Sequence, residues 1–207
     1  MKTFSTYVAL CCLAAIPALA QPRFTGFVGA GPTVPLNPTA SRTDDVGWNI
    51  AAGAGVSNNH LGLMLDFMFN DIGVNSNVLN QVGAPNGVVR TWGFTLDPVI
   101  HVTQEGPADI YFTGGGGIYH RTVEFSQPGV AETTFFDPWF GFYPGLVGTN
   151  QILASYSQYK GGLDGGVGAS FKLGNSRLKA FVEARYHYIF TRPVATTMIP
   201  VTIGLRW

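Results

Sequence analysis

Residues 198–207 read Met-Ile-Pro-Val-Thr-Ile-Gly-Leu-Arg-Trp, and two sets of side chains alternate along them. The first set is entirely apolar and consists of Ile199, Val201, Ile203, Leu205 and Trp207. The second set is polar or small and consists of Pro200, Thr202, Gly204 and Arg206. A period of two residues is typical of a β-strand with one apolar face. We therefore predict a strand over this stretch.

The setting of this strand decides the fold class. At the edge of a soluble sheet, a strand this apolar would be an aggregation hazard. In the wall of a barrel in lipid, the apolar face contacts hydrocarbon and Trp207 lies at the membrane interface. Alternating apolar residues that end on an aromatic resemble the closing strand of bacterial outer-membrane β-barrels. That resemblance implies that the apolar set from Ile199 to Trp207 is the signal read by the barrel assembly machinery. A strand of an ordinary β-sandwich is the alternative.

The first twenty residues predict export. Lys2 precedes an apolar core over residues 7–16, and Ala18-Leu19-Ala20 has the small-x-small pattern of a cleavage site. We interpret residues 1–20 as a cleaved signal peptide and 21–207 as one domain. Both cysteines lie inside this leader, and Leu10 before Cys11 does not fit a lipoprotein signal. The mature chain is thus expected to lack thiols and disulfides.

Composition limits the function classes. Of the 207 residues, 46% are hydrophobic, 13% are aromatic, 27 are glycine and only 12% are charged. After the leader, no apolar run is long enough for a membrane-spanning helix. Without Lys2, 12 − 1 = 11 basic residues face 12 acidic ones, a net charge of −1. This balance gives no indication of nucleic-acid binding.

Alternation and turn residues predict about eight strands. They cover residues 23–31, 47–56, 61–70, 89–102, 109–125, 159–172, 178–190 and 198–207. Long connections over 32–46, 71–88 and 126–158 alternate with short turns, as in outer-membrane barrels. Pro98 cannot donate a ladder hydrogen bond, so we expect a bulge or kink there. The segment 126–158 is expected to be the longest irregular stretch.

Charged side chains follow the same alternation. Within the strands they lie on the face opposite the apolar one: Asp66, Asp97, Asp164, Lys172, Lys179, Glu183, Arg185 and Arg206. A Lys or Arg facing lipid near the midplane would cost about 2–4 kcal/mol. A soluble sandwich would show the same pattern. The leader, Trp207 and the interface aromatics favour a membrane barrel over a sandwich. These aromatics form two predicted girdles, Trp48, Phe69, Trp92 and Tyr188 at one end and Phe171 and Trp207 at the other.

Taken together, residues 21–207 resemble the small bacterial outer-membrane barrels of the OmpA/OmpX type. The resemblance implies an all-β fold, a closed antiparallel transmembrane barrel of about eight strands, exported to the outer membrane. It also implies a monomer that contacts outer-membrane lipid and lipopolysaccharide. No peptidoglycan-binding domain is expected after Trp207, so the sequence does not support an anchoring role at the cell wall.

The interior charges are the first candidate site. An eight-stranded barrel is just wide enough for side chains to fill, and charges there must be paired. We predict that Asp66, Asp97, Asp164, Glu183, Arg185 and Arg206 form one interior network. A structural ion-pair core is the favoured interpretation, and a gated proton or ion path is the alternative.

An aromatic loop segment is the second candidate site. It contains Phe135, Phe136, Trp139, Phe140, Phe142 and Tyr143. Exposed aromatics on a long loop often mark contact sites, but they could also fold over the barrel mouth or dip into lipopolysaccharide. The sequence therefore favours a structural or surface-interaction barrel. A narrow passive pore and a lipid A-modifying enzyme are the alternatives, and the enzyme would need a Ser/His pair that no His-x-Ser motif supplies.

No metal or cofactor is expected. The histidines His60, His101, His120 and His187 show no metal-binding spacing. Gly114 to Gly117 lie in a strand and lack the Lys-Ser/Thr of a phosphate loop. We interpret them, with the glycines of 161–168, as easing barrel curvature or leaving room for bulky interior side chains such as Tyr119.

Overall fold

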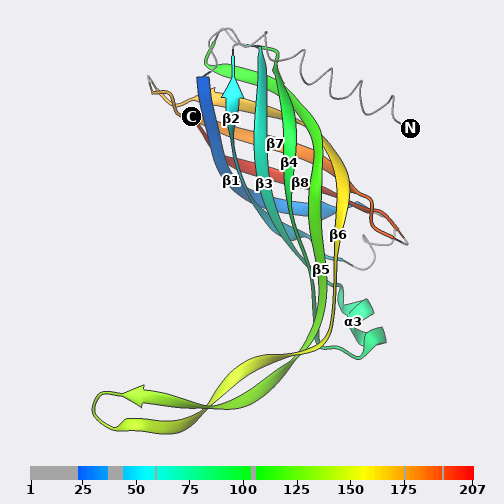
Figure 1. The fold of residues 1–207 in the computed structure, drawn as a ribbon, viewed down its shortest axis with the longest axis vertical. Helices are drawn as coiled ribbons and strands as arrows, with labels where there is room; N and C mark the ends of the chain where they lie inside the picture. The colour runs from blue at the N-terminus through cyan, green and yellow to red at the C-terminus, as the bar shows by residue number, and fades with distance from the viewer. Residues whose placement is uncertain (1–22, 37–43, 59, 104–105, 175, 193) are drawn as a thin grey trace.

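Eight antiparallel strands close into one barrel in chain order, as the computed structural model of the chain shows (Figure 1). The described residues are 23–36, 44–58, 60–103, 106–174, 176–192 and 194–207; the predicted leader therefore lies outside them. The strands are β1 (Arg23–Pro35), β2 (Gly47–Ser57), β3 (Leu61–Gly73), β4 (Asn86–His101), β5 (Ala108–Asp137), β6 (Gly141–Lys172), β7 (Lys179–Ile189) and β8 (Thr196–Arg206). The predicted fold class is confirmed.

The alternation of the last strand closes the barrel wall. β8 pairs with both β7 and β1, and Leu205 lies opposite Val28 of β1. Its apolar residues face outward, with Ile203 61% exposed, while Thr202 and Arg206 are buried in the interior. An apolar exterior around a polar interior suits a barrel whose solvent is lipid.

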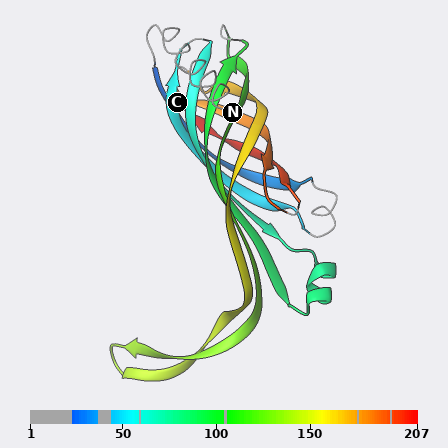
Figure 2. The ribbon, with the colours of Figure 1, turned by 45° about the vertical axis from the view of Figure 1, so that its right-hand side comes forward.

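Residues 126–158 are not irregular, which corrects the prediction from sequence. β5 and β6 continue as paired strands as far as Asp137 and Gly141, with one register shift at Phe125/Ser126. This hairpin projects beyond the barrel wall and curves away from it (Figures 1 and 2). Its strand character was hidden because both faces are exposed, so no apolar-polar alternation marks it.

Two smaller predictions also need correction. The predicted loop 71–88 is shorter and contains a helix, α3 (Ser76–Val82), which is capped by the Asn75 side chain and ends at Gly83 with φ 71°. Pro98 causes no bulge, because β4 keeps one register with β3 from Leu61 to Gly73 and pairs Leu63 with Pro98. The ladder from β4 to β5 is nevertheless interrupted at Asp97 and Pro98, opposite Gly114 and Gly115, with the same register on both sides, as expected for a residue that cannot donate a ladder hydrogen bond.

Aromatic residues and exterior charges mark the height of the lipid-facing band. Trp48 packs on Phe69 at a ring-centroid distance of 5.5 Å, and Trp92 packs on Tyr159 at 5.9 Å. Just beyond this belt the first outward charges appear: Arg90 binds Asp71 at 3.1 Å and Glu124 at 2.8 Å. Charges of this kind belong outside the hydrocarbon, so the belt marks one boundary of the band; Phe171 and Trp207 lie at the other.

The two ends of the barrel differ. Short turns gather at one end, between β2 and β3, β4 and β5, and β6 and β7, together with Trp207 (Figure 1). The long connections, α3 and the β5–β6 hairpin lie at the other end. No helix among the described residues is long and apolar enough to cross a membrane.

Candidate functional site

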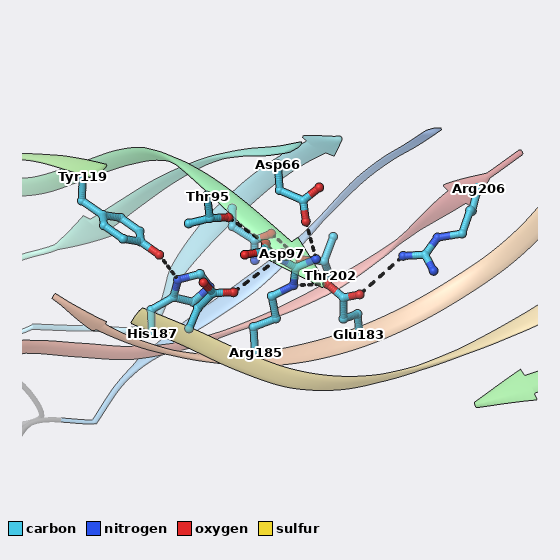
Figure 3. A network of polar contacts seen from close by, with 11 residues as sticks. Asp66, Thr95, Asp97, Tyr119, Glu183, Arg185, His187, Thr202 and Arg206 are labelled. Carbon is cyan, nitrogen blue, oxygen red and sulfur yellow. Dashed lines mark hydrogen bonds and ion pairs between the residues drawn. The ribbon is translucent and has the colours of Figure 1, made fainter. Parts of the chain in front are cut away.

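Arg185 is the centre of an ion-pair network inside the barrel (Figure 3). Its Nη2 lies 2.6 Å from an Asp66 oxygen and its Nη1 lies 2.7 Å from an Asp97 oxygen. Its Nε lies 2.5 Å from Glu183, and Asp164 is 3.5 Å from Nη1. Four carboxylates from β3, β4, β6 and β7 therefore meet on one guanidinium, which ties strands far apart in the sequence together across the interior.

Arg206 extends the network toward the short-turn end. Its Nη2 lies 3.6 Å from Glu183, the carboxylate that also binds Arg185. Its guanidinium carbon stands 4.2 Å from the centroid of the Tyr111 ring, within range of a cation–π interaction. The structure thus brings together all six residues that the sequence analysis placed in the interior network, and each of the six side chains is at most 8% exposed.

Glycines make room for these interior groups. A Cβ added at Gly166 would lie 2.7 Å from Cγ of Arg185, and one at Gly162 would lie 2.8 Å from the Tyr119 ring. Both distances are shorter than normal carbon contacts. The glycine-rich run of β6 therefore faces the bulkiest interior side chains, as the sequence analysis expected for Tyr119.

A second polar layer lies between the network and the long-loop end. The Tyr119 hydroxyl lies 2.9 Å from Nδ1 of His187, and both side chains are buried. Thr202, which lies directly opposite Glu183 of the network, donates its hydroxyl to Asn49 at 2.9 Å. Sequence reasoning did not single out these contacts, although the inward position of each residue in its strand was a usable signal.

The two layers fill the lumen. A void between them, beside Arg185 and Tyr119, has a volume of about 20 Å³, which is room for about one water molecule. A network of this kind holds strands together, and removal of one partner leaves an uncompensated buried charge. The network therefore stabilises the barrel and blocks its lumen.

The predicted aromatic contact residues lie at the far end of the hairpin. Phe135 stacks on Tyr143 at 5.8 Å and Phe136 packs on Phe142 at 5.1 Å, one pair on each face of the ribbon. In the turn between them, Trp139 is 87% exposed and Phe140 is 85% exposed. These aromatics do not fold over the barrel mouth, because the hairpin carries them away from it (Figure 2).

We call residues 122–159 the arm. Its two strands pair with each other, but along most of their length no further strand is bonded to their outer edges within the described residues: β4 stops pairing at Ser126 and β7 at Gly162. The arm also contains three acidic residues, Glu124, Glu132 and Asp137, and no Lys or Arg. It is therefore an acidic ribbon with exposed apolar side chains and open backbone edges.

Solved structures provide an independent comparison. No protein-family model matches the chain, and no curated protein matches it. The chain is similar to Neisserial surface protein A over 88% of its own length and 95% of that protein, with 14% identity and a TM-score of 0.59. It is also similar to a major outer membrane protein from Thermus thermophilus, over 88% and 98% of the two chains, with 11% identity and a TM-score of 0.55.

The chain has the fold of a small outer-membrane β-barrel. At these identities the similarity establishes the fold, and the role has to come from the chain's own residues. Within this outer-membrane barrel fold, two features carry side chains in unusual settings: the plugged interior around Arg185 and the arm with its aromatic tip.

Proposed function

We propose that this chain is an outer-membrane barrel that serves as a rigid base for a protein-binding arm at the cell surface. The proposal rests on the arm, a paired ribbon that projects from the barrel. The apolar side chains of the arm are exposed. Those residues include Val130, Phe136, Trp139, Phe140, Phe142, Leu146 and Ile152. Exposed apolar patches of this kind mark interaction sites.

Two properties of the arm favour a protein over lipopolysaccharide as its partner. Glu124 at the base of the arm is paired with Arg90, which leaves Glu132 and Asp137 as the arm's acids, with no Lys or Arg in residues 122–159. Lipopolysaccharide is rich in phosphate, and a ribbon with this charge would repel it. Open strand edges, by contrast, can add an extended segment of another chain through backbone hydrogen bonds. Trp139 and Phe140 would then act as anchors, since large aromatics dominate protein interfaces.

The proposal includes the location and assembly of the chain. Residues 1–20 would be cleaved during export, and the short-turn end would face the periplasm, as in other outer-membrane barrels. The apolar exterior below the Trp48–Phe69 belt would contact outer-membrane lipid and lipopolysaccharide. The barrel would insert as a monomer through the barrel assembly machinery, guided by Ile199, Val201, Ile203, Leu205 and Trp207.

The interior supports a structural role over transport or catalysis. Arg185 and its four carboxylates occupy the path that a solute would take, which argues against the narrow pore. The buried His187 lies against Tyr119, His101 lies against Asp109, and His120 lies 3.4 Å from the Thr122 hydroxyl, so none of these three described histidines has a serine as its hydrogen-bond partner. We therefore propose no enzymatic activity.

Site-directed photo-crosslinking on intact cells tests the proposal. A benzoylphenylalanine would replace Phe140 at the tip of the arm, and a matched variant would carry it at the lipid-facing Leu163 of the same strand pair. We expect protein adducts from position 140 in the cell's natural surroundings and only lipid adducts from position 163. Adducts to lipopolysaccharide alone, or to the barrel's own loops, at position 140 would reject a protein-binding arm.

A further inference from the structure

A large cavity opens at the short-turn end of the barrel, opposite to the arm. Its volume is about 800 Å³, within the usual range for small-molecule sites. Its lining includes five basic residues: Arg23, Lys172, Arg177, Lys179 and Arg206. Among the described residues of the lining, the one acidic side chain is Asp109, and it lies 2.6 Å from His101. The cavity is therefore strongly basic.

Three of these cations form a row across neighbouring strands. Lys172 of β6 lies directly opposite Lys179 of β7, and Lys179 lies directly opposite Arg206 of β8. Like charges in directly opposed positions of a sheet repel each other and destabilise it. The row therefore costs stability unless an anion lies between the three side chains.

Arg206 supplies an independent sign of a missing partner. The residue is only 7% exposed, yet its Nε has no hydrogen-bond partner among the described residues. Its contact with Glu183 goes through Nη2 at 3.6 Å, which is longer than a good hydrogen bond. A buried guanidinium N–H without an acceptor is unfavourable, and this one lies in the wall of the basic cavity.

We propose that this cavity is a binding site for a phosphate-bearing anion. Lys172, Lys179 and Arg206 would bind the phosphate oxygens, with Arg23 and Arg177 at the entrance. A phosphate ester carries close to two negative charges at neutral pH, which suits a row of three cations better than a single carboxylate does. The volume leaves room for an organic group attached to the phosphate.

The ligand could be a soluble organic phosphate or the headgroup of an anionic phospholipid. Both present the same phosphate to the cation row, and in the proposed orientation both are reached from the periplasmic side. The site does not depend on the arm or on its partner, so either proposal can fail while the other stands.

Calorimetric titration of the folded barrel with inorganic tripolyphosphate tests the site. In an uncharged detergent we expect saturable binding at one site per barrel. The double variant Lys172→Gln/Lys179→Gln should weaken it at least tenfold, whereas Lys160→Gln, on the same strand but next to the belt residue Tyr159 at the arm end of the barrel, should leave it unchanged. Absence of saturable binding to the unmodified barrel, or equal weakening by Lys160→Gln, would overturn the site.

Two further measurements are urea unfolding of the double variant and titration in nanodiscs of different lipid composition. Without anion, the double variant should unfold at the same urea concentration as the unmodified barrel or a higher one, because a repulsion has been removed; a purely structural role of the lysines predicts a lower one. Repeating the titration in nanodiscs with and without phosphatidylglycerol separates the two sources. Competition by phosphatidylglycerol identifies a lipid headgroup as occupant, and its absence identifies a soluble phosphate.

Discussion

At the scale of single residues, Arg185 is the common ion-pair partner of the interior carboxylates. It is within 3.5 Å of four carboxylates on four different strands. A buried guanidinium with this many partners cannot be replaced by an apolar side chain without leaving several negative charges uncompensated. Nearby glycines such as Gly166 cannot be replaced easily either, because a side chain there would enter space that the Arg185 side chain occupies.

Arg185→Ala should lower the free energy of unfolding by about 3–5 kcal/mol, the usual cost of breaking a buried ion pair. The double variant Arg185→Ala/Glu183→Ala should recover only part of that loss, because Asp66 and Asp97 keep their charges without a cation. Urea unfolding followed by heat-modifiable gel migration measures both. Arg192→Ala, in the exposed β7–β8 loop, is the control and should change little.

Two glycines of β6 provide a matched pair for testing the interior packing. A Cβ at Gly166 would lie 2.4 Å from the Ala184 carbonyl oxygen and 2.7 Å from Cγ of Arg185, whereas one at Gly165 would find its nearest neighbour, the Thr113 carbonyl, at 3.9 Å. Gly166→Ala should cost about 1–3 kcal/mol through overpacking, and Gly165→Ala should be close to neutral. Equal urea midpoints for the two variants would show that the interior has more room than the structure indicates.

At the scale of elements, β8 and the arm have opposite roles. β8 completes the wall through pairs with both of its neighbours, and its backbone bonds continue to Trp207, whose N–H donates to Gly26 at 3.0 Å. The arm belongs to β5 and β6, and beyond Ser126 it pairs with neither β4 nor β7. The barrel should therefore depend on β8 and not on the arm.

Trp207→Asp should abolish stable insertion, whereas Trp207→Phe should preserve it. Aspartate removes the interfacial aromatic and places a charge at the lipid boundary; phenylalanine keeps the apolar ring. Immunoblots of membrane and periplasmic fractions measure the result, with the aspartate variant expected as degraded periplasmic chain. Normal membrane levels of that variant would contradict the assembly role given to residues 199–207.

Removal of the arm should leave the barrel intact. Joining Gln127 to Gln151, which lie opposite each other, through an Asn-Gly turn removes the free part of the arm and keeps Glu124 to Ser126, which pair with β4. We expect the unfolding free energy to stay within about 0.5 kcal/mol of the original, as for changes outside the core. A shortened chain that no longer folds would show that the arm is part of the barrel's stability.

At the scale of the whole molecule, the barrel is a plugged cylinder with different surfaces at its two ends. The arm carries acidic and apolar side chains beyond one end, and a basic cavity opens at the other. Between them lie the Arg185 network and the Tyr119–His187 pair, with a void of about 20 Å³. The two ends are thus separated by packed polar side chains.

The filled interior predicts that the barrel conducts ions weakly or not at all. Planar bilayer recordings should show no steady open level for the unmodified chain. Arg185→Ala should lower the free energy of unfolding; a pore would instead keep its stability and change its ion selectivity. Steady, large single-channel currents from the unmodified barrel, together with an Arg185→Ala variant of normal stability and altered selectivity, would support the pore alternative.

Local alternation, together with the leader, Trp207 and the interface aromatics, was enough to predict the barrel, and alternation alone assigned the residues of its interior network. In a strand, neighbouring side chains point to opposite faces, so the positions of Ile203 and Arg206 in the sequence already assign one to lipid and the other to the lumen. The same rule placed Asp66, Asp97, Asp164, Glu183 and Arg185 inside. Which of them touch, and that Arg185 is their common partner, depends on strand pairing and on the register of the closed sheet.

The arm and the basic cavity were decided only by the tertiary structure. The arm has no buried face, so its sequence carries no alternation, and its strands are defined by backbone pairing between residues such as Phe136 and Phe142. Lys172, Lys179 and Arg206 were each assigned to the interior from sequence, but separations of 7 and 27 residues (179 − 172 and 206 − 179) conceal that they are direct neighbours. The local sequence determines whether a side chain points to the lumen or to the lipid. Which residues become neighbours across strands depends on the strand register, a property of the whole closed sheet.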